Sequence, residues 1–124
     1  MLAGNFYFVG ASTATANALK CEVNFASSHA IFRGHFPDVP IVPGVCMMQI
    51  VKELFSEHIG LPLQFRKVAL MKFLSLINPL EAPTIQVELS WSPVTEKSWQ
   101  LAASFSNDGV VCFKFKGVAE QGLK

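Results

Sequence analysis

The chain carries little charge and no strong excess of either sign. Only 15% of its 124 residues are Asp, Glu, Lys or Arg, and ten basic residues nearly balance nine acidic ones. Such a chain has no extended electrostatic field that would attract a polyanion. The composition therefore argues against binding to nucleic acid and against adsorption to an anionic membrane.

Cysteines are few, and they are not arranged as metal ligands. Cys21, Cys46 and Cys112 form no CxxC pair and have no histidine at the spacing of a zinc site. An odd number of cysteines in a short chain is typical of free thiols in a reducing compartment. We therefore expect neither a disulfide scaffold nor a metal site, and we predict a cytoplasmic protein.

Long hydrophobic runs are also absent. Runs such as residues 45–48 are far shorter than the roughly 20 residues that a membrane-spanning helix needs. Residues 1–18 have an apolar character, but no Lys or Arg precedes Lys20 and glycines interrupt the stretch, which disfavours a signal peptide. We interpret this stretch as a first strand and loop, and we expect no membrane span.

Apolar side chains, in contrast, are abundant. Hydrophobic residues make up 51% of the chain, and Phe alone occurs 11 times. A chain of 124 residues has the size of one domain, so we expect a single domain over residues 1–124. The apolar surplus suggests additional buried surface, at a dimer interface or in a tunnel for an apolar ligand.

Four segments alternate between apolar and polar residues, as strands with one wet face do. They are residues 19–25, 85–91, 99–105 and 111–115, and the turn at Asn107, Asp108 and Gly109 joins the last two into a hairpin. Two further apolar segments, 68–77 and 6–9, are additional strand candidates. The sequence thus predicts a sheet of five to six antiparallel strands.

One segment, residues 44–58, has the pattern of a long helix that Gly60 and Pro62 would end. Residues 45–48 are apolar on every side, so we expect the first turns to be buried all round. Further along, an apolar stripe at 50, 51, 54 and 55 lies opposite a polar stripe that we expect to be solvated: Gln49, Lys52, Glu53 and Ser56. One helix with this sheet is an α+β layout in which the sheet wraps around the helix.

The segment before the helix combines stiffness with a potential base. Three prolines and two glycines fall within residues 34–44, which form an irregular loop that leads directly into the helix. His35 lies in this loop, and the ordinary pKa of histidine near 6.5 suits a base at neutral pH. A lone loop histidine is usually structural or merely exposed, and we expect His29 and His58 to be surface residues, so the surrounding pattern decides the role of His35.

That pattern resembles a known signature. Gly-His-Phe-Pro at 34–37, Pro-Ile at 40–41 and Pro-Gly-Val at 43–45, opening an apolar helix, are similar to the (3R)-hydroxyacyl-acyl carrier protein dehydratases, which have the hot-dog fold. The order and spacing of the predicted strands resemble that family from about Leu19 to Ala119. The resemblance implies dehydration of a β-hydroxyacyl thioester that an acyl carrier protein holds on its phosphopantetheine, with no further cofactor.

The resemblance also implies roles for three positions. His35 would remove the proton at C2, and the N–H of Gly44 would polarise the thioester carbonyl. A helix carboxylate from the other subunit of a dimer would act on the C3 hydroxyl, but fourteen residues beyond His35 this chain has Gln49. Glutamine holds a hydroxyl but transfers no proton, which predicts a rate lower by about 10²–10⁴. Neither Glu53 nor Asp38 matches the family position.

Two groups of side chains are candidates for binding the substrate and its carrier. We predict that an acyl tunnel is lined by Phe32, Phe36, Ile41, Val42, Pro43, Val45 and Phe73. We predict that basic residues at its mouth meet an acidic carrier protein: Arg33, Arg66, Lys67 and Lys72. The ordinary alternatives are core packing for the apolar set and scattered surface charge for the basic set.

Three functional hypotheses remain open at this stage. The first is a dehydratase that works as a homodimer or higher oligomer. The second is a catalytically weakened subunit that pairs with a carboxylate-bearing homologue in a heterodimer, which Gln49 favours. The third is an acyl thioesterase, since the hot-dog fold includes hydrolases. The product from one β-hydroxyacyl substrate separates them, because they yield an enoyl thioester, nothing or a free acid.

Overall fold

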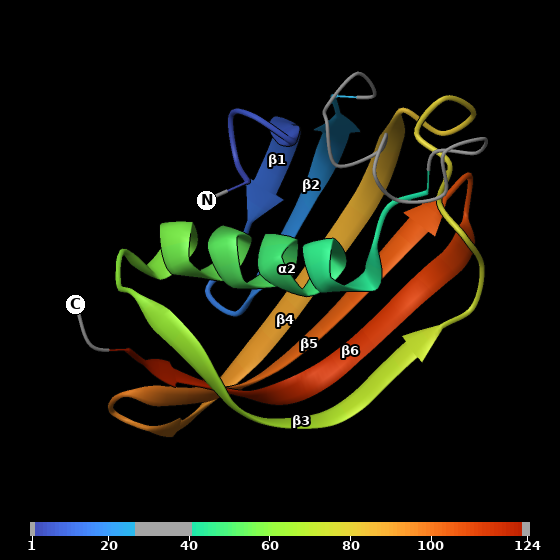
Figure 1. Cartoon of the computed structure of the whole chain (residues 1–124). Coiled ribbons are helices and arrows are strands. Elements are labelled where there is room, and N and C mark those ends of the chain that lie inside the picture. Colours follow the sequence, from blue (N-terminus) through green and yellow to red (C-terminus); the bar gives the residue numbers. More distant parts are fainter. Residues whose placement is uncertain (1, 27–40, 123–124) are drawn as a thin grey trace.

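The structure, a computed structural model, describes residues 2–26 and 41–122. In this part of the chain a helix, α2 (Gly44–Ile59), lies across the concave side of a curved six-stranded antiparallel sheet (Figure 1). The strands are β1 (Tyr7–Ala14), β2 (Ala18–Phe25), β3 (Leu63–Phe73), β4 (Thr84–Thr95), β5 (Ser98–Asn107) and β6 (Val110–Gln121). The predicted α+β hot-dog architecture, with a sheet wrapped around one long helix, is confirmed.

The sheet order is β1-β2-β4-β5-β6-β3, so β1 and β3 form its two edges. The four alternating segments correspond to β2, β4, β5 and β6. The β5–β6 hairpin turns at Asp108 and Gly109, which both have positive φ, 49° and 80°. This is the conformation that the Asp-Gly pair predicts.

The limits of the edge strand β3 differ from the prediction. It covers Leu63–Phe73 instead of 68–77, and it pairs with β6 from Leu63 opposite Gln121 to Phe73 opposite Phe113. Two register shifts interrupt this pairing, and most side chains of β3 are exposed. Because neither face is continuously buried, the strand has no clean alternation from which its limits could be predicted.

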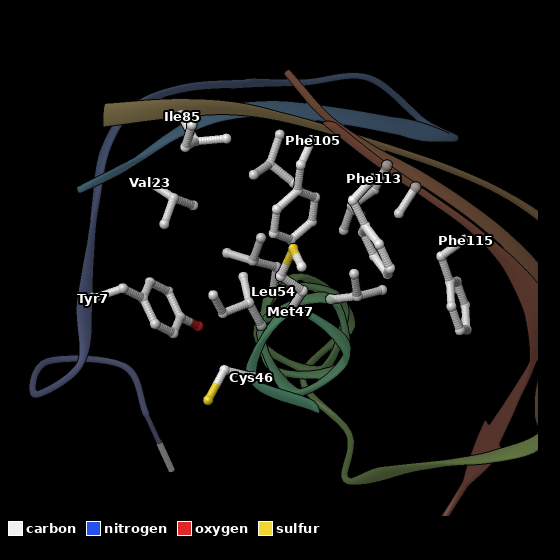
Figure 2. Packing of buried hydrophobic residues seen from close by; sticks show 14 of the residues in the cluster. Tyr7, Val23, Cys46, Met47, Leu54, Ile85, Phe105, Phe113 and Phe115 are labelled. Atoms are coloured by element: carbon white, nitrogen blue, oxygen red, sulfur yellow. The ribbon is translucent and has the colours of Figure 1, made fainter. Parts of the chain in front are cut away.

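One cross-strand row of side chains leads from the core to Phe73, next to the start of the helix. Cys21, Val87, Phe105, Phe113 and Phe73 lie directly opposite one another on successive strands. The rings of Phe105 and Phe113 meet edge to face at 5.3 Å. Figure 2 shows such sheet side chains packed against the helix, and Tyr7 pointing toward it from β1.

Two expectations about the helix were wrong. The first turn is not buried all round, since Val45 is 73% exposed, and Glu53 is not solvated, since it is only 7% exposed. Glu53 is covered because the start of the chain folds over that side of α2 and forms hydrogen bonds with it. Helical periodicity describes only α2 itself, so it could not predict this cover.

All three cysteines are buried and unpaired, as the sequence predicts. Within residues 2–26 and 41–122, no helix is long and apolar enough to cross a membrane. In the same residues, no three His, Cys, Asp or Glu side chains gather closely enough to hold a metal ion. The prediction that the protein binds no metal remains a prediction.

Candidate active site

The start of α2 has backbone donors that no acceptor inside the helix can reach. Pro43 is the N-cap residue and offers no side-chain hydrogen bond, and the first turn contains no acidic residue. The N–H groups of Cys46 and Met47 donate to the Pro43 carbonyl at 3.0 and 3.2 Å. The N–H groups of Gly44 and Val45 precede them and have no acceptor within the helix. With the helix dipole, they favour an oxygen that gains negative charge.

The ring of Phe73 lies against this helix start. A Cβ atom on Gly44 would be 2.6 Å from Cζ of Phe73, so a side chain at position 44 would displace the ring. Phe73 packs on Phe113 at 5.1 Å between ring centroids, yet 48% of its surface stays exposed. It is therefore not simply a core residue. The fold brings together Gly44 and Phe73, two residues that the sequence named separately.

Gln49 lies in the second turn of α2 and is half-buried. Its Nε2 donates a hydrogen bond to Oε2 of Glu53, one turn further along, at 2.8 Å. The sequence identified Glu53 as the neighbouring acid that does not match the family position. The structure shows that it contacts the residue that does match.

Glu53 is fully engaged by hydrogen-bond donors. The Leu2 N–H lies 2.9 Å from Oε2 and 3.1 Å from Oε1, and the Ala3 N–H lies 2.8 Å from Oε1. The hydroxyl of Tyr7 donates to Oε1 at 3.2 Å. Only long-range contacts with the start of the chain place these donors there, and no local pattern around Glu53 signals them.

These contacts determine the ionisation states of Glu53 and Tyr7. Burial raises the pKa of the Glu53 carboxyl, but the hydrogen bonds from Leu2, Gln49, Ala3 and Tyr7 outweigh it and hold that pKa below its ordinary value. Burial, followed by the charge of Glu53 and the hydrogen bond to it, raises the pKa of the Tyr7 hydroxyl. Glu53 is therefore an ionised acceptor, and it is unsuited to donate a proton at neutral pH.

Some predicted site residues lie outside the described residues, namely His35, Phe32, Arg33 and Phe36. Of the others, Ile41 and Val42 are buried, and the Val42 N–H donates to the Ile77 carbonyl at 2.9 Å. Pro43 and Gly44 are half-buried at the helix start. Three predicted carrier contacts are exposed on β3: Arg66, Lys67 and Lys72. The functional roles of all these residues remain predictions.

With this geometry in place, comparison with known proteins identifies the family. A family model described as ApeI dehydratase, ApeI-like, matches residues 11–116. The chain belongs to the ApeI-like dehydratase family. The match covers the loop, α2 and most of the sheet, and it confirms the resemblance to dehydratases drawn from the segment 34–49.

Individual relatives are more distant. The chain is 29% identical over 97 residues to the 3-hydroxyacyl-acyl-carrier-protein dehydratase FabZ of Chlamydia pneumoniae. The matched residues make up 70% of this chain and 63% of that protein. The chain thus spans less than two thirds of the length of that relative. It is also 27% identical over 82 residues to the FabZ of Chlamydia caviae, and this match covers 59% of this chain and 53% of that protein.

Solved structures have the same fold at low sequence identity. The dehydratase heterocomplex ApeI:P of Xenorhabdus doucetiae matches with a TM-score of 0.73 and 16% identity, over 93% of this chain and 98% of that chain. A mutant of the thioesterase PA1618 of Pseudomonas aeruginosa matches with a TM-score of 0.65 and 11% identity, over 92% and 79%. These likenesses establish the architecture that ApeI-like dehydratases share with thioesterases.

Proposed function

We propose that the chain dehydrates β-hydroxyacyl thioesters held on the phosphopantetheine of an acyl carrier protein, giving the trans-enoyl thioester and water. The observation that carries this proposal is the ApeI-like dehydratase match over residues 11–116, which includes the complete segment 34–49. The name of the Chlamydia pneumoniae relative supports the substrate class, because it states a 3-hydroxyacyl group on acyl carrier protein. The elimination moves a proton and a hydroxyl group, so it needs no redox cofactor.

In this proposal His35 removes the proton at C2. The thioester oxygen gains negative charge in that step and accepts a hydrogen bond from the Gly44 N–H. The uncapped first turn of α2, which contains no acidic residue, supports this role for Gly44. The apolar part of the substrate would contact the residues predicted for the tunnel: Phe32, Phe36, Ile41, Val42, Pro43, Val45 and Phe73.

Gln49 takes the place of the helix carboxylate. It holds the C3 hydroxyl by a hydrogen bond, and it neither donates nor removes a proton in the reaction. His35 must then carry both proton transfers in a homodimer, taking the C2 proton and returning one to the leaving hydroxyl. We expect such a homodimer to be slower than a site that contains a carboxylate, by about 10²–10⁴.

A heterodimer is the second candidate. The chain would then supply the scaffold and part of the site, and a homologous subunit would supply the missing carboxylate. Gln49 favours this arrangement. The Xenorhabdus doucetiae dehydratase, which is itself a heterocomplex, supports it as well.

We propose that the subunit contact, in either assembly, uses the edge strand β3. This strand ends the sheet, so its outer backbone groups have no strand partner in the sheet of the described residues. Its exposed apolar side chains include Val68, Leu70, Met71 and Phe73. A second hot-dog subunit would cover them, with a contact above roughly 1,000 Å². Light scattering at micromolar concentration tests this, since a 13.6 kDa particle would contradict it.

Carrier docking would use the basic side chains predicted from the sequence, three of which lie on the same strand. Arg33, Arg66, Lys67 and Lys72 are the predicted contacts, and Lys114 lies directly opposite Lys72 on β6. Two like charges in opposite cross-strand positions destabilise a sheet slightly. An acidic carrier protein would offset that repulsion, which supports this end of the β3–β6 pair as the docking region.

Product identification from one β-hydroxyacyl carrier thioester tests the function. A dehydratase gives the enoyl thioester, a thioesterase gives the free acid, and a non-catalytic subunit gives neither without its partner. The His35→Ala variant should lose enoyl formation while it keeps its fold and assembly. Retention of more than about a tenth of the activity would rule out His35 as the base, given the usual size of acid–base effects.

We also propose a cytoplasmic location. Disulfides are rare in reducing compartments, and the three unpaired cysteines are consistent with such a compartment. Burial raises the pKa of Cys21 to about 11 and raises the pKa of Cys46 as well. Neither thiol is therefore activated toward oxidation.

A further inference from the structure

Glu53 is a buried carboxylate whose partners within residues 2–26 and 41–122 are all hydrogen-bond donors without a charge. Among the described residues the structure has one ion pair, Lys20 with Glu88 at 3.5 Å, and Glu53 is not part of it. Burying a charged group is costly unless its hydrogen-bonding capacity is filled. The start of the chain and Gln49 together fill it.

The two oxygens of Glu53 divide these donors unequally. Oε1 accepts from Leu2, Ala3 and Tyr7, so it serves only the start of the chain. Oε2 accepts from Leu2 and, at 2.8 Å, from Gln49. The hydrogen bonds from Leu2, Ala3 and Tyr7 hold the start of the chain against Glu53. The hydrogen bond from the Gln49 amide to Oε2 is not one of them.

This contact determines which way the Gln49 amide faces. An ionised carboxylate only accepts hydrogen bonds, so Gln49 must turn its NH₂ group toward Glu53. The carbonyl Oε1 of Gln49 then points away, and no donor among the described residues occupies it. With Glu53 in place, Gln49 presents an acceptor.

We propose that Glu53 is a positioning residue that fixes Gln49 as a hydrogen-bond acceptor for the β-hydroxyl of the substrate. The inference rests on the proposed function, since it takes Gln49 to be the residue that meets this hydroxyl. The arrangement suits elimination, because the hydroxyl donates its hydrogen to Gln49 and keeps its lone pairs free for the incoming proton. A ligand with a β-keto group has no such hydrogen, so the site binds it more weakly.

The test compares a ligand that donates at the β position with one that only accepts. The ligands are the amide analogues of β-hydroxyhexanoyl-pantetheine and β-ketohexanoyl-pantetheine, which resist elimination and hydrolysis during titration calorimetry. We expect the wild type to bind the β-hydroxy ligand at least about tenfold more tightly, because the keto oxygen would face the Gln49 carbonyl. A wild type that binds both equally overturns the inference and leaves the proposed function standing. Binding of neither ligand overturns both.

The Glu53→Gln variant separates orientation from stability. An amide at position 53 can donate or accept, so Gln49 can turn over and offer its NH₂ group to the keto oxygen. We expect the preference to fall to within about twofold. Glu53→Asp gives a second measurement if Glu53→Gln does not fold: it keeps the charge but withdraws the carboxylate from Gln49, so the preference should fall again. An unchanged preference in a folded variant overturns the inference.

Tyr7→Phe is the matched control. It removes a donor from Oε1 of Glu53 but leaves the Oε2 contact with Gln49 intact. It should lower stability while the hydroxy-over-keto preference stays within about twofold of the wild type. If Tyr7→Phe lowers the preference as much as Glu53→Gln does, the effect is a general loosening of the fold and the inference is overturned.

Discussion

Gln49 and Glu53 lie one helical turn apart on α2, and the amide of the first donates to the carboxylate of the second at 2.8 Å. The dehydratase resemblance implies a carboxylate at position 49. This chain has its buried carboxylate one turn further along, where the start of the chain surrounds it. The helix thus carries an acid, Glu53, at a position where it orients Gln49 instead of transferring a proton.

Exchanging the two residues should restore the acid. In the double variant Gln49→Glu/Glu53→Gln, a Gln amide can still donate to a Glu carboxylate across the same turn, and the carboxylate now occupies position 49. We expect formation of enoyl thioester from a β-hydroxyacyl thioester to rise about 10²-fold, or roughly 2.7 kcal/mol of barrier. Chromatography of the products measures it. No increase in a folded, assembled variant would mean that Gln49 is not the defect.

The single variant Gln49→Glu should differ from the double variant in its pH profile. It places two carboxylates within hydrogen-bond distance in a partly buried site, and mutual repulsion raises the pKa of one member of such a pair. We expect the pair to keep a shared proton at higher pH than the single carboxylate of the double variant. The pH dependence of kcat should therefore be displaced upward in Gln49→Glu. Superimposable profiles would show that the two side chains are not coupled.

Glu53 should also make stability depend on pH on the acid side. Its pKa in the folded state lies below the ordinary 4.5, so its ionisation adds stability above the unfolded pKa. That stability is lost as the pH falls through the folded pKa. Urea unfolding of wild type and Glu53→Gln from pH 7 downward should show the larger acid loss in the wild type, below about pH 4.5. Parallel curves would contradict the hydrogen-bonded, ionised carboxylate.

Local sequence patterns predicted the parts of the fold that have one wet and one dry face. The alternating strands and the Asp-Gly hairpin belong to this class, because period-two burial is written into each segment. The predicted limits of strand β3 were wrong because its side chains are mostly exposed and do not alternate between buried and exposed positions. Glu53 was assigned to a solvated face because its cover, Leu2, Ala3 and Tyr7, lies far away in the sequence. The Gly44–Phe73 contact is likewise long-range, so the sequence named both residues separately but could not predict that they touch.

Gly44 and Phe73 should be energetically coupled. Gly44→Ala keeps the backbone N–H but forces a Cβ atom to within 2.6 Å of the Phe73 ring, so we expect overpacking to cost about 1–3 kcal/mol of unfolding free energy. Phe73→Leu withdraws the ring, and the double variant should recover most of that cost beyond the effect of Phe73→Leu alone. Urea unfolding of the four proteins forms a double-mutant cycle. Strictly additive effects would mean that the ring does not touch the helix start in solution.

The lysines at the end of the β3–β6 pair test carrier recognition separately from chemistry. Lys72 and Lys114 are exposed and lie directly opposite each other on β3 and β6. Neither forms an ion pair among the described residues, so they present two positive charges to a partner. We expect Lys72→Glu/Lys114→Glu to raise KM for the carrier-bound substrate about tenfold, most strongly at low ionic strength, because screening weakens such contacts. KM for the same acyl group on free pantetheine should not change.

Lys20→Glu provides the control for that experiment. It reverses one charge on β2, which β4, β5 and β6 separate from β3 in the sheet, and it disrupts the Lys20–Glu88 pair. It should therefore affect stability slightly without changing KM for the carrier. Lys20→Glu changes the net charge half as much as the Lys72 and Lys114 substitutions together, so an increase in KM about half as large on a logarithmic scale would point to net charge alone as the cause. An increase with free pantetheine would instead place the two lysines at the acyl site, and either result would remove the β3–β6 end as the docking region.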